Sequence, residues 1–286
     1  MTTLHSATSA KPLLKWAGGK RHIAPIIESY FPPEWRRGTY FEPFFGGGAM
    51  FFSLAPEHSH ISDLNSRLVG FYSHLRSDSE ALVEGISEQA AIFNNLDEES
   101  KKLHFYDLRE RFNNCDKHSF ESAVLTYCIN KLCFNGLYRE NSKGEFNVPF
   151  GQKKSLPNPD KQDFGNAAIA LAGATIENMD FVDATKNAKK GDLVYFDPPY
   201  IPLNITASFT SYQADGFSLE DQKRLSNLMN EMKEKGIYAV CSNSSTAITK
   251  EIYQSHNQFE IEAPRMVSAT SSGRGMVKEL VITNFS

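Results

Sequence analysis

One short motif, Asp197-Pro198-Pro199-Tyr200, has the residue types that could hold and activate an amino group. It follows the sequence DLVYF at 192–196, which predicts a strand that ends at the motif. The two prolines fix the backbone φ angle and remove two N–H donors, so the turn presents a carboxylate, carbonyl oxygens and an aromatic ring. This set offers two acceptors for the N–H bonds of an exocyclic amine and a ring on which a base can stack. We interpret the motif as a catalytic site rather than as a chance turn.

A glycine-rich turn nearer the N-terminus is a second candidate ligand site. A strand predicted over 38–42 runs into the sequence EPFFGGG at 42–48, and an apolar helix start follows. Glycines let the backbone approach a ligand closely, and sheets of parallel strands bind ligands at the carboxyl ends of their strands. The glycine spacing matches neither a dinucleotide loop nor a triphosphate loop. Taken alone, the turn fits a ligand site and a structural turn equally well.

Asp63 makes the ligand interpretation more specific. It ends the next predicted strand, at 58–62. A carboxylate in this place can accept hydrogen bonds from ribose hydroxyls. The alternative is that Asp63 caps a helix predicted over 65–75. Together with the glycine turn, Asp63 favours a ligand that contains adenosine.

The order of the predicted elements indicates an α/β fold. Strands are predicted at 38–42, 58–62, 174–178, 192–196 and 237–241, separated by helices that include 65–75, 160–172 and 219–235, and a helix at 246–254 precedes strands at 258–263 and 277–284. The alternation predicts a mainly parallel, doubly wound sheet in which the strand ending at Asp197 lies beside the strand 38–42. The last two strands lack an intervening helix, so we predict that they pair antiparallel at the edge of the sheet.

A block of helices interrupts this alternation. Helices are predicted at 78–93, 98–112 and 120–133, where apolar residues recur every three or four positions. Residues 134–158 mix Gly, Asn, Pro, aromatic and basic residues, which predicts a hairpin or an ordered binding loop. We therefore predict a core domain of residues 1–75 and 160–286 and an inserted domain of residues 76–159, with its hairpin at about 134–154.

Composition indicates a globular protein. Of the 286 residues, 41% are hydrophobic and 22% are charged, which argues against a disordered or fibrous chain. The sequence has neither a bilayer-length apolar run nor a secretory signal, and its four cysteines lack Cys-x-x-Cys spacing. We expect a soluble, cytoplasmic protein with free thiols.

The net charge of −4 conceals a segregated distribution. Six basic and two acidic residues occupy 11–37, and five basic and two acidic residues occupy 127–154. Between these segments, 76–121 carries six basic and eleven acidic residues. This distribution favours a surface with one basic face, as a nucleic-acid-binding protein requires.

Three motifs in this order resemble the Dam-type DNA adenine-N6 methyltransferases, the α group or D12 class. They are LKWAGGKR at 14–21, FEPFFGGG at 41–48 and DPPY at 197–200, and the resemblance covers about residues 12–284. The segments NGLYR at 135–139 and GEFNVPFG at 144–151 resemble the DNA-contacting hairpin of the relatives that modify GATC. The resemblance implies a Rossmann-like fold that depends on S-adenosylmethionine, with an inserted, mainly helical DNA-recognition domain.

The resemblance also implies roles for residues at matching positions. Binding of S-adenosylmethionine would involve Trp16, Lys20, Phe44, Gly46, Gly48, Asp63, Asp180, Phe181 and Asp197. Catalysis would involve Asp197, Pro198, Pro199 and Tyr200, without a metal. DNA would be bound by Asn135, Leu137, Arg139, Pro149, Lys153 and Lys154. Gln152 departs from the pattern, because GATC-modifying relatives commonly have Arg there, and this puts one DNA contact in doubt.

The expected reaction is methyl transfer from S-adenosylmethionine to N6 of adenine in duplex DNA, within GATC, by base flipping and in-line displacement. The expected partner is double-stranded DNA in the nucleoid of a bacterial or phage-host cell. A restriction endonuclease could be paired with the protein in function without contact, and we expect a monomer that binds no membrane. Two alternatives stay open: an N-methyltransferase that acts on RNA or a protein amide, and a non-catalytic DNA-binding relative. Amide-modifying relatives usually carry Asn where this chain has Asp197, which argues against the first.

Overall fold

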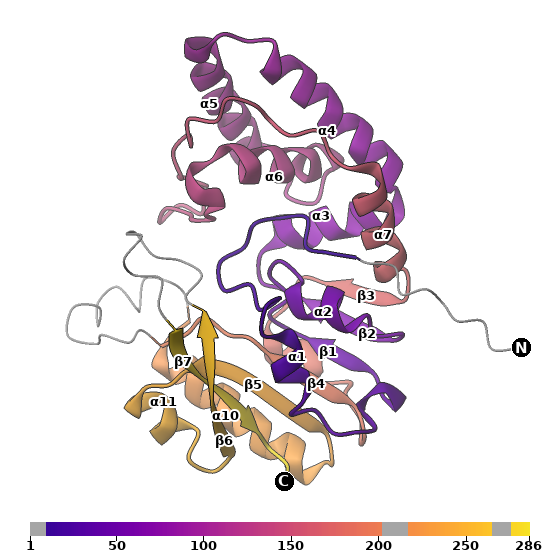
Figure 1. The fold of residues 1–286 in the computed structure, drawn as a ribbon, viewed down its shortest axis with the longest axis vertical. Coiled ribbons are helices and arrows are strands. Elements are labelled where there is room, and N and C mark those ends of the chain that lie inside the picture. The colour runs from indigo at the N-terminus through magenta and orange to yellow at the C-terminus, as the bar shows by residue number, and fades with distance from the viewer. Residues whose placement is uncertain (1–9, 202–216, 265–275) are drawn as a thin grey trace, which may run out of the picture. The chain divides into compact units, whose positions relative to one another are not determined.

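The computed structural model describes residues 10–201, 217–264 and 276–286 (Figure 1). These residues form two compact units. The first is drawn from Met1–Arg21, Gly46–Ala55 and Asp63–Asn178, and the second from His22–Phe45, Pro56–Ser62 and Met179–Ser286. The chain therefore passes between the units several times within its first 63 residues.

The second unit is built on a sheet whose strands lie in the order β2-β1-β4-β5-β7-β6. The strands are β1 (Tyr40–Glu42), β2 (Ser59–Ser62), β4 (Leu193–Phe196), β5 (Tyr238–Ser244), β6 (Asn257–Pro264) and β7 (Met276–Thr283). Strand β4 pairs parallel with β1, with Tyr40 opposite Leu193, and also pairs parallel with β5. Strand β7 runs antiparallel to both β5 and β6. The predicted position of the strand that ends at Asp197 beside the strand 38–42 and the predicted antiparallel pair are confirmed.

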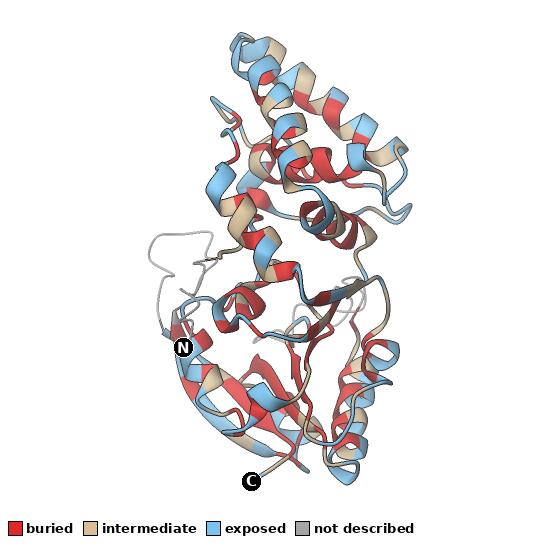
Figure 2. Ribbon diagram, turned by 90° about the vertical axis from the view of Figure 1, so that its right-hand side faces the viewer, coloured by how far each residue is buried: buried red, intermediate tan, exposed pale blue. Residues whose placement is uncertain are grey.

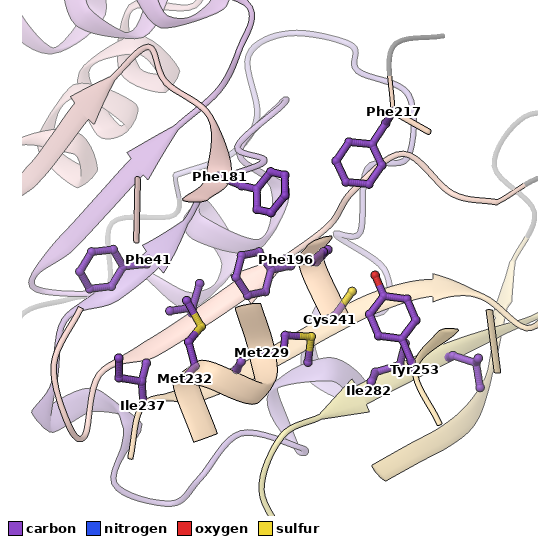
Figure 3. Close-up of a cluster of buried hydrophobic side chains, with 14 residues drawn as sticks. Phe41, Phe181, Phe196, Phe217, Met229, Met232, Ile237, Cys241, Tyr253 and Ile282 are labelled. Atoms are coloured by element: carbon purple, nitrogen blue, oxygen red, sulfur yellow. The ribbon is translucent and has the colours of Figure 1, made fainter. Parts of the chain in front are cut away.

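Burial explains why the motif-bearing strand is apolar throughout. All four residues of β4 are buried, as expected for a parallel strand covered on both faces (Figure 2). Helix α10 (Leu219–Glu234) contributes Leu225, Met229 and Met232 to the same core at helical spacing. Figure 3 shows Met229 and Met232 beside Phe196 of β4. A capping box between Ser218 and Asp221 fixes the start of this helix. Shorter helices of this unit are α1 (Ala24–Glu28), α8 (Phe181–Thr185), α11 (Ala247–Ile252) and the 3-10 turn η1 (Trp35–Arg37).

The first unit is mainly helical. Its elements are α2 (Ala49–Leu54), α3 (Ser66–Ser77), α4 (Ser79–Asn94), α5 (Glu98–Asn114), α6 (Phe120–Leu132), the 3-10 turn η2 (Phe134–Gly136), α7 (Lys161–Leu171) and the strand β3 (Ala174–Glu177). Helix α6 is the central one, because it packs against α3, α4 and α5 and is buried over most of its length. Helix α5, by contrast, buries only Phe105, Leu108 and Phe112 of its 17 residues (Figure 2).

The predicted α/β class and the helical block are confirmed. Helices α4, α5 and α6 each start within one residue of their predicted starts, where Asp78, Asp97 and Ser119 act as N-caps. The boundaries of the compact units differ from those of the predicted domains, because the glycine turn and the N-terminal segment belong to the unit that contains the helices. The division into a catalytic core and a recognition domain stays a prediction.

Two further expectations concern the state of the cysteines and the presence of membrane-spanning segments. All four cysteines are free thiols, and Cys128, Cys133 and Cys241 are buried. Within the described residues, every helix is too short or too polar to cross a lipid bilayer.

Candidate active site

The DPPY motif forms an ordered corner at the carboxyl end of β4. Asp197 and Tyr200 are half-buried, Pro198 is buried and Pro199 is exposed. The Ser242 hydroxyl on β5 donates a hydrogen bond to Asp197 Oδ1 at 2.7 Å. The side chains of the corner are therefore held by the neighbouring strand.

Tyr200 is fixed at its hydroxyl. This group donates to Glu279 Oε2 on β7 at 2.8 Å. Burial, together with the nearby charges of Asp197 and Glu279, raises the pKa of Tyr200 well above its usual range. Tyr200 therefore stays an uncharged donor at neutral pH, and the bond to Glu279 fixes the orientation of its ring.

The backbone of the corner is held as well. Gln222 Nε2 of α10 donates to the Pro199 carbonyl at 2.9 Å. On β5, Asn243 Oδ1 accepts from Ile201 N at 3.3 Å and Ser244 Oγ donates to the Ile201 carbonyl at 2.6 Å. Because two prolines already limit the backbone, these contacts leave the corner little freedom.

The glycine turn is tied to Asp63 in the first unit. Gly46 and Gly48 have φ angles of 52° and 71°, the left-handed region that favours glycine. Asp63 Oδ2 accepts from Gly46 N at 2.9 Å and Oδ1 accepts from Asn65 N at 2.8 Å. Asn65, not Asp63, is the N-cap of α3. The alternative role of Asp63 as a helix cap is therefore wrong.

The electrostatics of Asp63 are those of a carboxylate withdrawn from water. Burial raises its pKa, and the two backbone N–H groups that it accepts act in the opposite direction. Each carboxylate oxygen has two lone-pair sites, so two bonds from the protein leave acceptor capacity. The geometry is compatible with the predicted ribose contact.

Trp16 is not a core aromatic residue, and Lys20 is not a solvated surface base. Trp16 is half-buried, so it is not a core aromatic, and its ring lies 5.4 Å from that of Tyr138. A Cβ atom placed on Gly46 would lie 2.8 Å from Trp16 Cδ1, so the indole covers the turn closely. Lys20 is 5% exposed and its Nζ donates to the Gly18 carbonyl at 2.6 Å, so it is not a solvated surface lysine.

The N-terminal segment that carries Trp16 is fastened to α6. The Asn130 side chain accepts from Lys15 N and donates to the Lys15 carbonyl, both at 2.8 Å. The Lys131 ammonium donates to the Leu13 carbonyl at 2.6 Å. Gly136 (φ 68°) lies so close that a Cβ there would be 2.8 Å from Lys15 Cβ. This part of the chain and the start of the predicted hairpin thus form one packed piece.

The close contact at Gly46 gives a testable expectation. We expect Gly46→Ala to lower the free energy of unfolding by about 1–3 kcal/mol, because alanine is strained at this φ angle and its methyl group would press on Trp16. Differential scanning calorimetry and titration with S-adenosylmethionine would measure the stability and the expected loss of affinity.

Gly165→Ala is the matched control for Gly46→Ala. It lies in the interior of α7, where a Cβ would meet no atom within 4 Å. We expect this variant to be about 0.5–1 kcal/mol more stable and to bind the ligand normally. Equal behaviour of the two variants would contradict the packing argument.

The remaining predicted ligand residues belong to the second unit. Phe44 stacks on Phe181 with ring centres 5.4 Å apart and an interplanar angle of 27°. Asp180 caps α8 and pairs with Arg224 at 3.3 Å, and the Arg224 guanidinium lies 5.0 Å from the Phe181 ring centre. Phe181 is 2% exposed and forms part of the core (Figure 3). Its predicted place near an adenine ring stays a prediction.

The predicted DNA-binding residues lie on an irregular hairpin. Antiparallel bridges join Glu140 to Phe146 and Cys133 to Phe150. The Arg139 side chain is exposed, and its Nε donates to Asn147 Oδ1 at 2.7 Å. The other predicted contacts are also accessible: Asn135, Leu137, Pro149 and Lys154 are exposed, and Lys153 is half-buried. Gln152 is exposed with a φ angle of 52°.

Sequence reasoning missed the residues that support these side chains. The run Ser242-Asn243-Ser244 was detectable, because three polar residues at the carboxyl end of an apolar strand are unusual. Gln222 had no such signal, since a glutamine in an amphipathic helix is ordinary. Tyr138 lies within a noted motif, but its ring contact with Trp16 joins residues distant in sequence.

Comparison with known proteins relates the whole arrangement to one family. The family model for D12 class N6 adenine-specific DNA methyltransferases matches residues 16–267. The chain is 41% identical to "Type II methyltransferase M1.LlaDCHI" of Lactococcus lactis subsp. cremoris, covering 96% of this chain and 95% of the relative. It is 37% identical to "Type II methyltransferase M.MjaIII" of Methanocaldococcus jannaschii, covering 96% and 99%. It is 35% identical to a "DNA adenine methylase" of Vibrio cholerae, covering 95% of each chain.

Proposed function

Because this chain belongs to the D12 class of N6 adenine-specific DNA methyltransferases, we propose that it methylates adenine N6 within GATC sites of duplex DNA, using S-adenosylmethionine. Adenine-specific DNA methylation is the activity of the family. The observation that carries the finer proposal is the ordered DPPY corner, where Asp197 is held by Ser242 and Tyr200 by Glu279.

Asp197 would activate the target amine. The N6 lone pair of adenine is delocalised into the ring, so the amine is a poor nucleophile. Hydrogen bonds from N6 to the Asp197 carboxylate and to the Pro198 carbonyl would localise that lone pair. The N6–CH₃ bond would form as the S–CH₃ bond breaks, the electron pair of the broken bond would stay on sulfur, and one proton of the methylated N6 would then pass to water. Fixed acceptors and in-line positioning are sufficient catalytic devices for such a step.

The residues present fit S-adenosylmethionine as the methyl donor. Asp63 supplies a half-buried carboxylate for the ribose hydroxyls, and Gly46 and Gly48 leave the turn without side chains. Trp16, Lys20 and Phe44 would bind the remainder of the molecule, with Asp180 and Phe181 near its adenine ring. The sulfonium group supplies the activated methyl.

Recognition of DNA would fall to the inserted residues 76–159. A stacked base is out of reach, so the target adenine would be flipped out of the duplex and would stack on Tyr200. The Nε atom of Arg139 is engaged by Asn147, so its terminal nitrogens would donate to guanine O6 and N7. Asn135 would enter the gap left by the flipped base. Leu137 and Pro149 would contact thymine methyl groups.

Lys153 and Lys154 would contact phosphates of the DNA backbone.

We also propose a cellular setting for this activity. The Type II names of two relatives support a functional pairing with a restriction endonuclease, which we propose takes place without physical contact. We further propose that the protein acts as a cytoplasmic, nucleoid-associated monomer.

Oligonucleotides in which each base of GATC is replaced in turn test the specificity. We expect every replacement to lower methylation. The measured quantity is the N6-methyladenine content of each duplex, determined by mass spectrometry after digestion. Equal modification of all duplexes would refute GATC recognition. Methyl transfer to RNA or to protein, with none to duplex DNA, would support the alternative substrate classes instead, and failure to bind S-adenosylmethionine would support a non-catalytic relative.

Arg139→Ala tests direct reading of guanine. We expect the variant to lose about ten- to hundredfold in discrimination at one guanine position, because a bidentate arginine–guanine contact contributes about 1–3 kcal/mol. Lys154→Ala is the matched control, since loss of a phosphate contact should weaken binding to all sequences alike. A uniform effect of Arg139→Ala on all duplexes would contradict its role.

A further inference from the structure

Three consecutive polar residues at the carboxyl end of β5 are buried. Ser242, Asn243 and Ser244 are 2%, 0% and 5% exposed. Burying a polar side chain in a sheet is unfavourable unless it forms hydrogen bonds. All three side chains form hydrogen bonds with the segment Asp197–Ile201, so the polar groups at the end of β5 are satisfied by the DPPY corner.

The contact of Ser242 with Asp197 has a defined direction. The Ser242 hydroxyl donates its single proton to Asp197 Oδ1 at 2.7 Å. The Tyr195 hydroxyl lies 2.9 Å from Ser242 Oγ, and it must be the donor to an oxygen whose own proton is engaged. Hydroxyl protons are thus ordered from Tyr195 to Ser242 to Asp197.

The environment of Tyr195 preserves this order. Tyr195 is fully buried in β4, two residues before Asp197. Burial, together with the charge of Asp197, raises the pKa of Tyr195 well above its usual range. Tyr195 therefore remains a neutral donor, and chained hydrogen bonds of this kind polarise one another in a buried environment.

We propose that Ser242, supported by Tyr195, is a positioning residue that sets the orientation of the Asp197 carboxylate toward the target amine. The proposal rests on the proposed function of Asp197. A hydrogen bond to one oxygen restricts rotation of the carboxylate about its Cβ–Cγ bond, so the acceptor atoms stay aligned with the N6–H group and the N6 lone pair stays directed at the methyl group. Alignment matters most in the transition state, and its loss lowers kcat more than it changes binding.

The first experiment measures kcat and KM for Ser242→Ala with duplex DNA. We expect kcat to fall about ten- to hundredfold, the loss typical of a hydrogen bond to a charged group, and KM for DNA and for S-adenosylmethionine to stay within about twofold. Ser242→Thr keeps the hydroxyl and should recover kcat to within a few-fold. Ser242→Cys keeps the side-chain shape but donates weakly, so it should resemble Ser242→Ala.

Ser226→Ala is the matched control. Ser226 is 4% exposed in α10 and its hydroxyl donates to the Ile252 carbonyl at 3.0 Å, so it loses a comparable buried bond. We expect reduced thermal stability with kcat unchanged. A kcat for Ser242→Ala or Ser242→Cys no lower than that of Ser226→Ala would overturn the positioning role.

A double-mutant cycle with Tyr195→Phe tests the ordered chain of hydroxyls. Alone, Tyr195→Phe should lower kcat several-fold, and in the Ser242→Ala background it should change nothing, because its effect passes through Ser242. Additive effects on kcat would overturn the support by Tyr195. A wild-type protein that fails to methylate adenine would refute the proposed function itself, whereas an active wild type with an unaffected Ser242→Ala would refute only this inference.

Discussion

Replacing Asp197 with alanine is expected to lower methyl transfer by about a thousandfold or more while leaving the fold intact. The methyl side chain cannot accept a hydrogen bond from N6, so the lone pair stays delocalised, and aimed electrostatic contacts of this kind contribute about a hundred- to thousandfold each. The substitution lies in a half-buried corner and removes the acceptor of the Ser242 hydroxyl without changing the backbone, so circular dichroism should be unchanged. Single-turnover methylation of duplex DNA measures the rate.

Asp183→Ala is the matched control for that experiment. Asp183 is an exposed acid in the first turn of α8, so its loss removes a carboxylate of the same unit without touching the corner. Its turnover should equal that of the wild type. Near-normal turnover by Asp197→Ala would refute the assignment of the catalytic motif.

The second large effect is expected at Asp63. We expect Asp63→Ala to weaken binding of S-adenosylmethionine about a hundred- to thousandfold, because the ribose hydroxyls lose a charged acceptor and hydrogen bonds to charged groups contribute about 1.5–3 kcal/mol each. The variant also leaves the N–H groups of Gly46 and Asn65 without their carboxylate. Isothermal titration calorimetry on the purified protein measures the affinity directly.

Asp160→Ala separates the ligand effect from loss of a local structural bond. Asp160 caps α7 by accepting from Asp163 N at 3.0 Å, and loss of such a cap costs about 1 kcal/mol of stability. Its affinity for S-adenosylmethionine should be normal. If Asp63→Ala binds as tightly as this control, Asp63 does not hold the ribose.

The parts of the fold that were predictable are those in which local pattern and burial agree. Strand β4 reads as an uninterrupted apolar run because both faces of the sheet are covered, and α6 repeats apolar residues because it is central to the helical unit. The element starts were also predictable, since Asp97 and Ser119 are typical N-caps. The compact units were not, because packing of the glycine turn with the helices depends on contacts distant in sequence.

The sequence predicts the residues that would act on a ligand, but it does not predict the residues that hold them in place. Asp197 and Asp63 stand at strand ends, where a carboxylate has few structural reasons to be, so sequence reasoning finds them. Ser242 bonds to Asp197 from 45 residues away, and Trp16 meets the turn at Gly46 across 30 residues. Such pairs come together only through tertiary structure. The pairing of these residues therefore follows only from the folded structure.

The fastening of the N-terminal segment to α6 and the hairpin has a consequence for changing which DNA sequence is modified. Lys15 is held at both backbone groups by Asn130, Trp16 packs on Tyr138, and Gly136 leaves no room beside Lys15. A hairpin transplanted from a relative would arrive without the partners that its base was shaped to meet. Altered specificity therefore calls for moving residues 13–16 together with the hairpin and its base, residues 130–154.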